Sequence, residues 1–181
     1  MLKIFTIGFV LALTVLATPA SAQYTYTGTT VGGPTWNRPN ANGNLAPTSL
    51  HAQATAVPYS VFQFAVTTTG AYTFQSTSLS PTSWDNYTFL YQTSFAAGSP
   101  LTNVVIGNDD NATIGLSGFA MSLTQGTTYF AVTTGAFNPV SGTFSNAING
   151  PGVVTTPEPG TLGLLGLALL PCGAFLRRRR R

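Results

Sequence analysis

Alternation of apolar and polar side chains is the feature that most constrains the fold of this chain. In its central part Phe62, Phe64 and Val66 are separated by Gln63 and Ala65, and similar runs recur towards residue 149. A period of two is that of a β-strand, in which successive side chains point to opposite faces of a sheet. Turn residues recur every eight to twelve positions or so, and no segment shows helical periodicity over three turns. We therefore predict an all-β domain.

The alternating runs locate the strands. We expect strands at residues 24–27, 59–66, 72–76, 86–92, 101–106, 119–123, 128–132 and 142–149. The second and third of these, joined by a turn at 67–70, are predicted to form a hairpin. Residues 86–92 carry Tyr87, Phe89 and Tyr91 on one face and Leu90 on the other, which is typical of a central strand.

Together the strands predict an antiparallel β-sandwich. We place it at residues 57–152, and treat residues 23–56 as its N-terminal strand and loop extension. In that extension, Trp36 is expected to cap one end of the core.

The N-terminus has the order of a secretory signal. Lys3 supplies a positive charge, residues 4–16 are apolar, and Ala20 and Ala22 form an Ala-x-Ala site for signal peptidase. We assign residues 1–22 to a signal peptide that is cleaved after Ala22. The alternative, an uncleaved anchor, is disfavoured by the short apolar run and the small residues that follow it.

The C-terminus has three features in a fixed order. Residues 153–161 contain Pro157, Glu158 and Pro159, and the two prolines predict an extended, exposed and unpaired stalk. The apolar residues 162–176 follow, and as a helix they cover ~22 Å of a ~30 Å hydrocarbon core.

Five arginines end the chain, and they are expected to stay on the cytoplasmic side as a membrane stop. They are Arg177, Arg178, Arg179, Arg180 and Arg181.

This order resembles the PEP-CTERM sorting signal of bacterial surface proteins. The resemblance implies processing near the Pro-Glu-Pro motif by an exosortase, a membrane-embedded cysteine protease-transpeptidase. It also implies export, a transient tether in the inner membrane by the sorting helix, and delivery to the surface or extracellular matrix of a Gram-negative bacterium. The alternative is an ordinary membrane anchor, for which the apolar run is short and rich in glycine.

The charges of the whole chain give a misleading picture of the domain. The formal charge is +3, yet between residues 23 and 156 the only charged side chains are Arg38, Asp85, Asp109 and Asp110, which sum to 1 − 3 = −2. Nucleic-acid binding needs clustered Lys and Arg, so that class of partner is excluded. The single cysteine, Cys172, lies in the apolar tail, so no disulfide is expected in the domain.

A second resemblance covers much of the sandwich. The segments Val-Pro-Tyr-Ser-Val-Phe-Gln-Phe at 57–64, Gly-Ala-Tyr-Thr-Phe at 70–74 and Asp-Asn-Tyr-Thr-Phe-Leu-Tyr at 85–91 precede Asn-Asp-Asp at 108–110 and Gly-Thr-Thr-Tyr-Phe at 126–130. In this order they resemble the bacterial pre-peptidase C-terminal type of domain. That resemblance implies a jelly-roll-like, non-catalytic module for adhesion or matrix contact. No protease domain is attached here, which departs from the usual pattern.

Asp85, Asp109 and Asp110 are candidate metal ligands. The two adjacent aspartates lie in a polar loop, and Asp85 begins another predicted strand. Carboxylate, amide and carbonyl oxygens suit Ca²⁺, which takes six to eight oxygen ligands, and the second resemblance supports this assignment. The alternative is turn chemistry, since Asn and Asp stabilise tight turns without a metal.

Catalysis is not expected. His51 is the only histidine, and no nucleophile elbow accompanies it. We expect a non-catalytic structural or adhesive protein of extracellular polymer or biofilm. The alternative is a secreted carbohydrate-binding module that stacks extracellular polysaccharide on Trp36 and Trp84, the second of which adjoins Asp85.

Overall fold

The computed structural model describes residues 21–41, 43 and 45–157, and within them the fold is all-β with antiparallel sheets. Its strands are β1 (Ala22–Thr29), β2 (Thr35–Trp36), β3 (Val57–Val66), β4 (Gly70–Ser80), β5 (Asn86–Gln92), β6 (Val104–Asn108), β7 (Leu116–Leu123), β8 (Tyr129–Gly135), β9 (Thr143–Gly150) and β10 (Val154–Thr155). The all-β class expected from the alternation is confirmed.

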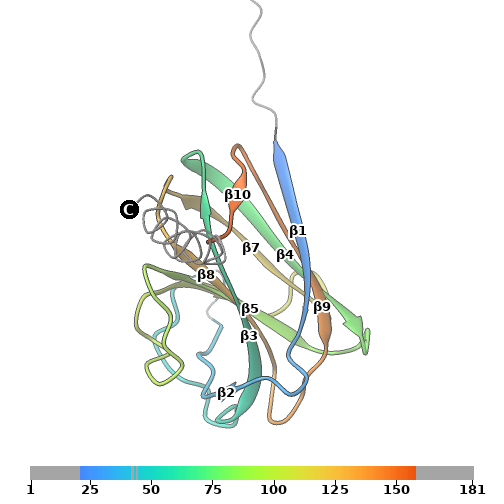
Figure 1. The fold of residues 1–181 in the computed structure, drawn as a ribbon. Coiled ribbons are helices and arrows are strands. Elements are labelled where there is room, and N and C mark those ends of the chain that lie inside the picture. Colours follow the sequence, from blue (N-terminus) through green and yellow to red (C-terminus); the bar gives the residue numbers. More distant parts are fainter. Residues whose placement is uncertain (1–20, 42, 44, 158–181) are drawn as a thin grey trace, which may run out of the picture.

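The strands form two antiparallel sheets packed face to face as a β-sandwich (Figure 1). One sheet has the order β1-β9-β4-β7, and the other has the order β10-β3-β8-β5-β6, with β2 added to β3. Both sheets contribute buried side chains to one core. Its members are Phe64, Val66, Tyr72, Phe74, Leu90, Ile106, Phe119, Leu123, Tyr129, Ala131, Ile148 and Val154.

The long strands pair in a nested order. β5 pairs with β6, β4 with β7, β3 with β8 and β1 with β9. Along the sequence, β5 and β6 therefore form the innermost pair, and β1 and β9 form the outermost pair. The outermost pair matches Ala22 to Gly150 and Thr29 to Thr143 without interruption. The fold therefore depends on contacts between the two ends of the domain, and β1 is a full member of the sheet.

The six-stranded sheet is also buried on its other face. A second cluster there contains Trp36, Ala54, Val57, Tyr87, Phe89, Tyr91, Val104, Val132 and Ala136. β5 lies between β8 and β6, with Leu90 in the inter-sheet core and its three aromatic residues in the second cluster. The prediction of a central strand at 86–92 is confirmed. Trp36, which was expected to cap one end of the core, is instead buried in this second cluster.

The predicted hairpin is wrong. β3 and β4 lie in different sheets, and the turn between them carries the chain from one sheet to the other. The pattern of each strand fixed which face is buried, and that was correct. It could not choose the neighbouring strand, because inward-facing apolar residues look the same whether the next strand pairs alongside or crosses the core.

Residues 153–161 were predicted to form an unpaired stalk, and this prediction is wrong for the first residues of that segment. Val154 and Thr155 form β10 and pair with Val66 and Ala65 of β3, so the chain is still in the sheet two residues before Pro157. Val154 is buried because it adds to the inter-sheet core. Pro157 itself is exposed.

The remaining terminal predictions concern residues outside the described part. These are the signal sequence up to Ala20, Glu158 and Pro159 of the motif, the apolar run 162–176 and the arginines 177–181. The part of the chain that the structure describes contains no helix with the length and hydropathy of a membrane span.

Replacing Leu90 by Ala tests the inter-sheet core. Leu90 is fully buried, at 0% exposure, so Leu90→Ala should lower the free energy of unfolding by about 2–5 kcal/mol. Leu79→Ala is the matched control, since Leu79 is 46% exposed, and its effect should stay within about 0.5 kcal/mol. Urea unfolding of both variants measures this, and similar losses at the two positions would contradict the assignment of the core.

Candidate cation site

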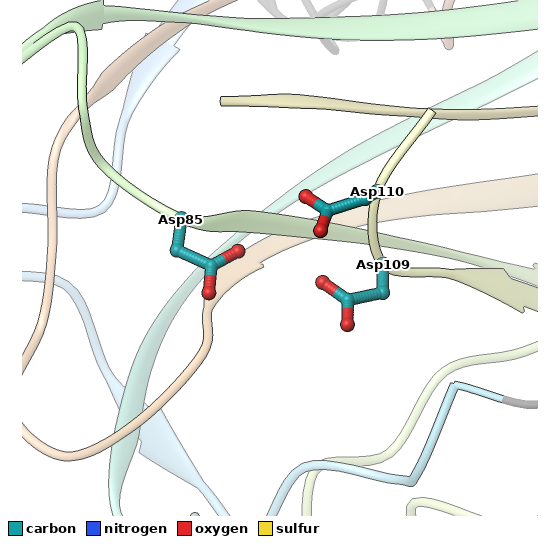
Figure 2. A group of neighbouring side chains, drawn as sticks. All are labelled: Asp85, Asp109 and Asp110. Atoms are coloured by element: carbon teal, nitrogen blue, oxygen red, sulfur yellow. The ribbon is translucent and has the colours of Figure 1, made fainter. Parts of the chain in front are cut away.

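Three carboxylates meet at one end of the six-stranded sheet. Asp85 immediately precedes β5, and Asp109 and Asp110 immediately follow β6. Because β5 and β6 are antiparallel and Thr88 lies opposite Asn108, the start of one strand is beside the end of the other. One oxygen of each carboxylate lies within 4.8 Å of those of the other two. Figure 2 shows Asp85 facing Asp109 and Asp110 across this space.

The segment that carries Asp85 is fixed from both sides. The backbone carbonyl of Asp85 accepts a hydrogen bond from the Ala136 amide at 3.0 Å. One residue earlier, the carbonyl of Trp84 accepts the Ser78 hydroxyl at 2.6 Å. These bonds anchor the approach to β5 on β4 and on the end of β8, so Asp85 is held at a defined position.

The loop after β6 is fixed as well. The Asn111 side-chain amide donates to Gln75 Oε1 at 2.6 Å, and the Asn111 backbone amide donates to the Leu116 carbonyl at 2.7 Å. Ala112 has φ of 77°, a left-handed conformation that costs an alanine about 1–2 kcal/mol. The loop thus holds a sharp turn that places Asp109 and Asp110 beside β5.

Two oxygens of this group are buried without a partner. Asp85 Oδ1 and Asp109 Oδ1 are both shielded from solvent and accept no hydrogen bond within the described residues. A buried, unpaired carboxylate oxygen is costly, and a cation is one way to satisfy it. The residues present therefore fit a hard cation bound by oxygen ligands.

The electrostatics of the group agree with this geometry. Burial, followed by the charges of Asp109 and Asp110, raises the pKa of Asp85 from 3.8 to about 6, and Arg38 opposes this shift. Burial and then Asp109 also raise the pKa of Asp110. The cluster resists full ionisation by itself, because like charges at short range disfavour the charged form.

Arg38 is the nearby positive group, and sequence reasoning used it only in the charge count. It is 1% exposed, and its guanidinium donates to the Ala136 carbonyl at 2.9 and 3.2 Å and to the Pro39 carbonyl at 2.9 Å. Its Cζ lies 3.8 Å from the centre of the Tyr87 ring. Burial lowers the pKa of Arg38, whereas Tyr87, Asp109 and Asp85 raise it.

Tyr87 links the arginine to the acidic group. Burial raises the pKa of its hydroxyl, and a side-chain hydrogen bond with Asp109 raises it further. All the charged side chains between residues 21 and 157 are therefore coupled. Three carboxylates and one guanidinium sum to −3 + 1 = −2, a charge that one divalent cation balances.

The two tryptophans do not offer a stacking surface. Trp36 is 3% exposed and packs against Tyr59, Phe89, Tyr91 and Phe95. Trp84 is 1% exposed and lies against Phe144. Since a sugar ring needs an accessible aromatic face, these positions carry no carbohydrate site in this structure. Both were predicted as ligand contacts because sequence does not reveal which large aromatics are buried.

His51 lies in a loop with its ring against Phe137, at 5.6 Å between centroids. Its Nδ1 accepts the Gln53 amide at 3.2 Å, and burial followed by Arg38 lowers its pKa. Neither contact brings it to a serine hydroxyl or a carboxylate.

Comparison of the sequence with models of known protein families and with curated proteins finds no match.

Titration of Asp85 predicts how stability depends on pH when no divalent cation is present. Between pH 3.8 and about 6 the folded state keeps a proton that the unfolded chain has lost. The free energy of unfolding should therefore fall as pH rises through this window and level off above it. Thermal unfolding in chelator at several pH values measures the fall.

Asp85→Asn should remove most of this fall in stability, because the titrating group is gone. Asp110→Asn is the matched control, because it removes one neighbouring charge and leaves Asp85 in place. In this variant most of the decrease in the free energy of unfolding with pH should remain. A wild-type stability that rises across the window, or one whose slope Asp85→Asn leaves intact, would contradict the account.

Proposed function

We propose that this chain is an exported, non-catalytic protein of the bacterial cell surface or extracellular matrix. Signal peptidase removes residues 1–22, and the sorting helix at 162–176 tethers the chain in the inner membrane while the five arginines stay in the cytoplasm. An exosortase then processes the tail near Pro157, Glu158 and Pro159. The domain has a structural or adhesive role in extracellular polymer or biofilm.

The placement of the strands carries this proposal. All ten described strands lie between residues 22 and 155. Cleavage after Ala22 removes one of the eight residue pairs between β1 and β9, and cleavage near the motif falls after β10. Both processing steps therefore leave the sandwich whole, as a sorting route for a folded domain requires.

The strand order supports a jelly roll. The nested pairs β1-β9, β3-β8, β4-β7 and β5-β6 divide between two sheets in the order 1-9-4-7 and 3-8-5-6. Eight strands in two sheets, connected as two Greek keys, is the arrangement of a jelly roll. It agrees with the non-catalytic module that the second resemblance implies.

A divalent cation has a defined role in this proposal. Asp85, Asp109 and Asp110 would hold Ca²⁺, with backbone carbonyls and water completing its ligands. The ion would neutralise the partly buried carboxylates of Asp85 and Asp109 and the exposed one of Asp110, and it would join the segment before β5 to the loop after β6. Extracellular modules of this kind bind Ca²⁺ with dissociation constants of about 0.1–1 mM, so export would load the site.

Intact mass of the protein from cells with and without the exosortase gene tests the sorting route. With the enzyme, the mass should correspond to a chain that starts at Gln23 and ends near residues 157–159, together with any attached group. Without it, the mass should include residues 160–181. Pro157→Ala combined with Pro159→Ala should block processing, because the extended motif is lost.

Pro34→Ala is the control, since Pro34 is an exposed proline outside the motif. A mass that still includes Arg181 in both strains would identify the tail as a plain membrane anchor. Equal processing of the wild type and the double variant would show that the motif is not recognised.

A further inference from the structure

The outer edge of β1 is open along its whole length. β1 lies at the border of its sheet, and within the described residues β9 is the strand that pairs with it (Figure 1). The unused backbone amides and carbonyls of a border strand are a template for pairing with another strand. Proteins usually obstruct such an edge with charged residues, proline or a bulge.

β1 has none of these obstructions. Its sequence, Ala-Gln-Tyr-Thr-Tyr-Thr-Gly-Thr, contains no charge and no proline. Its eight pairs with β9 follow one another without a register shift, so no bulge twists the edge away. Cleavage after Ala22 leaves residues 23–29 of this strand in the mature protein.

The borders of the six-stranded sheet are less accessible than β1. The outer edge of β3 carries β2 at one end and β10 at the other. β6 is short and its pairing with β5 is irregular, and side-chain bonds tie its end to β7. In those bonds the Asn108 side chain accepts the Gly118 amide near the start of β7, which is the other border strand of the four-stranded sheet. β1 is thus a border that a further strand can reach over its full length.

A half-buried aromatic group lies at the same border. Tyr26 stacks on Phe62 of β3 at 4.0 Å between ring centroids, and Tyr24 stacks on the same ring at 5.6 Å. All three side chains are only partly buried, although they pack on the core. Since β1 and β3 are border strands of the two sheets, this group closes the side of the sandwich and keeps apolar surface available there.

We propose that the β1 edge pairs antiparallel with β1 of a second copy of this chain. Residues directly opposite each other in an antiparallel pair share a face. Pairing Thr25 with its own copy therefore sets Tyr24 opposite Tyr26 and keeps every exposed threonine on the outer face. A two-fold axis brings identical side chains together, and an uncharged strand meets its copy without repulsion. The two aromatic groups become neighbours across the axis and lose solvent exposure.

Sedimentation of the exported protein, recovered from cells that express the full chain, tests this pairing. The wild type should form dimers in a concentration-dependent manner. Thr25→Lys combined with Thr27→Lys should weaken dimerisation at least tenfold at low salt, because like charges are then opposed across the axis. The matched control is Thr73→Lys combined with Thr77→Lys, on the same outer face of β4, which is paired on both sides.

Disulfide trapping gives a second measurement that does not depend on the folding of the lysine variants. With Cys172 replaced by serine, Thr25→Cys should yield a disulfide-linked dimer, because Thr25 lies opposite its own copy, and Gln23→Cys should yield less because Gln23 lies opposite Thr27. A cysteine at Thr73 should not. The proposal would be overturned if the wild type stayed monomeric throughout the concentration series or if both lysine pairs lost dimer equally. A crosslink at Thr73 alone would also overturn it.

Discussion

Burial of one face of each long strand against the opposite sheet is the interaction on which the rest of this structure depends. The domain has no disulfide and four charged side chains, so apolar contact between the sheets is its main source of stability. Polar bonds inside the core add specificity. Asn86 of one sheet donates to Ser76 of the other, and Asn146 donates to Thr133, each at 2.8 Å. Because a buried amide that loses its partner is costly, such bonds favour one alignment of the sheets.

The same architecture explains where the charges lie. The inner faces hold mostly aromatic and aliphatic residues with a few buried polar groups, and the exposed positions of the strands carry uncharged side chains, among them Thr25, Thr27 and Thr73. The acidic side chains lie at strand ends, where antiparallel pairing of β5 and β6 brings Asp85 to Asp109 and Asp110. Arg38 comes from the long segment between β2 and β3, and it reaches the group because that segment covers the outer face of the six-stranded sheet. The site is thus a consequence of the topology as much as of the acidic residues.

Much of the fold was predictable from the sequence, because alternation reports which side chains are buried. The approximate positions of the strands after residue 59 and the central position of β5 follow from that signal, although β6 begins at Val104 and not at Leu101 as expected. The partner of each strand does not, so the hairpin of β3 and β4 was wrong. β10 was missed because two residues are too few to show a period. The three aspartates were found because charged residues are scarce in this domain, whereas Arg38 was missed because its position beside Tyr87 depends on the course of a long loop.

Whether the charged group binds Ca²⁺ can be measured by calorimetric titration of the ion into the exported protein after removal of divalent cations. We expect one ion per chain, with a dissociation constant of about 0.1–1 mM. Binding should be lost in Asp109→Asn, whose Oδ1 is buried and accepts no hydrogen bond within the described residues. It should be kept in Asn103→Asp, which adds an acid in the exposed loop before β6. No binding at Ca²⁺ concentrations well above that range, or unchanged binding by Asp109→Asn, would show that these carboxylates do not form a Ca²⁺ site.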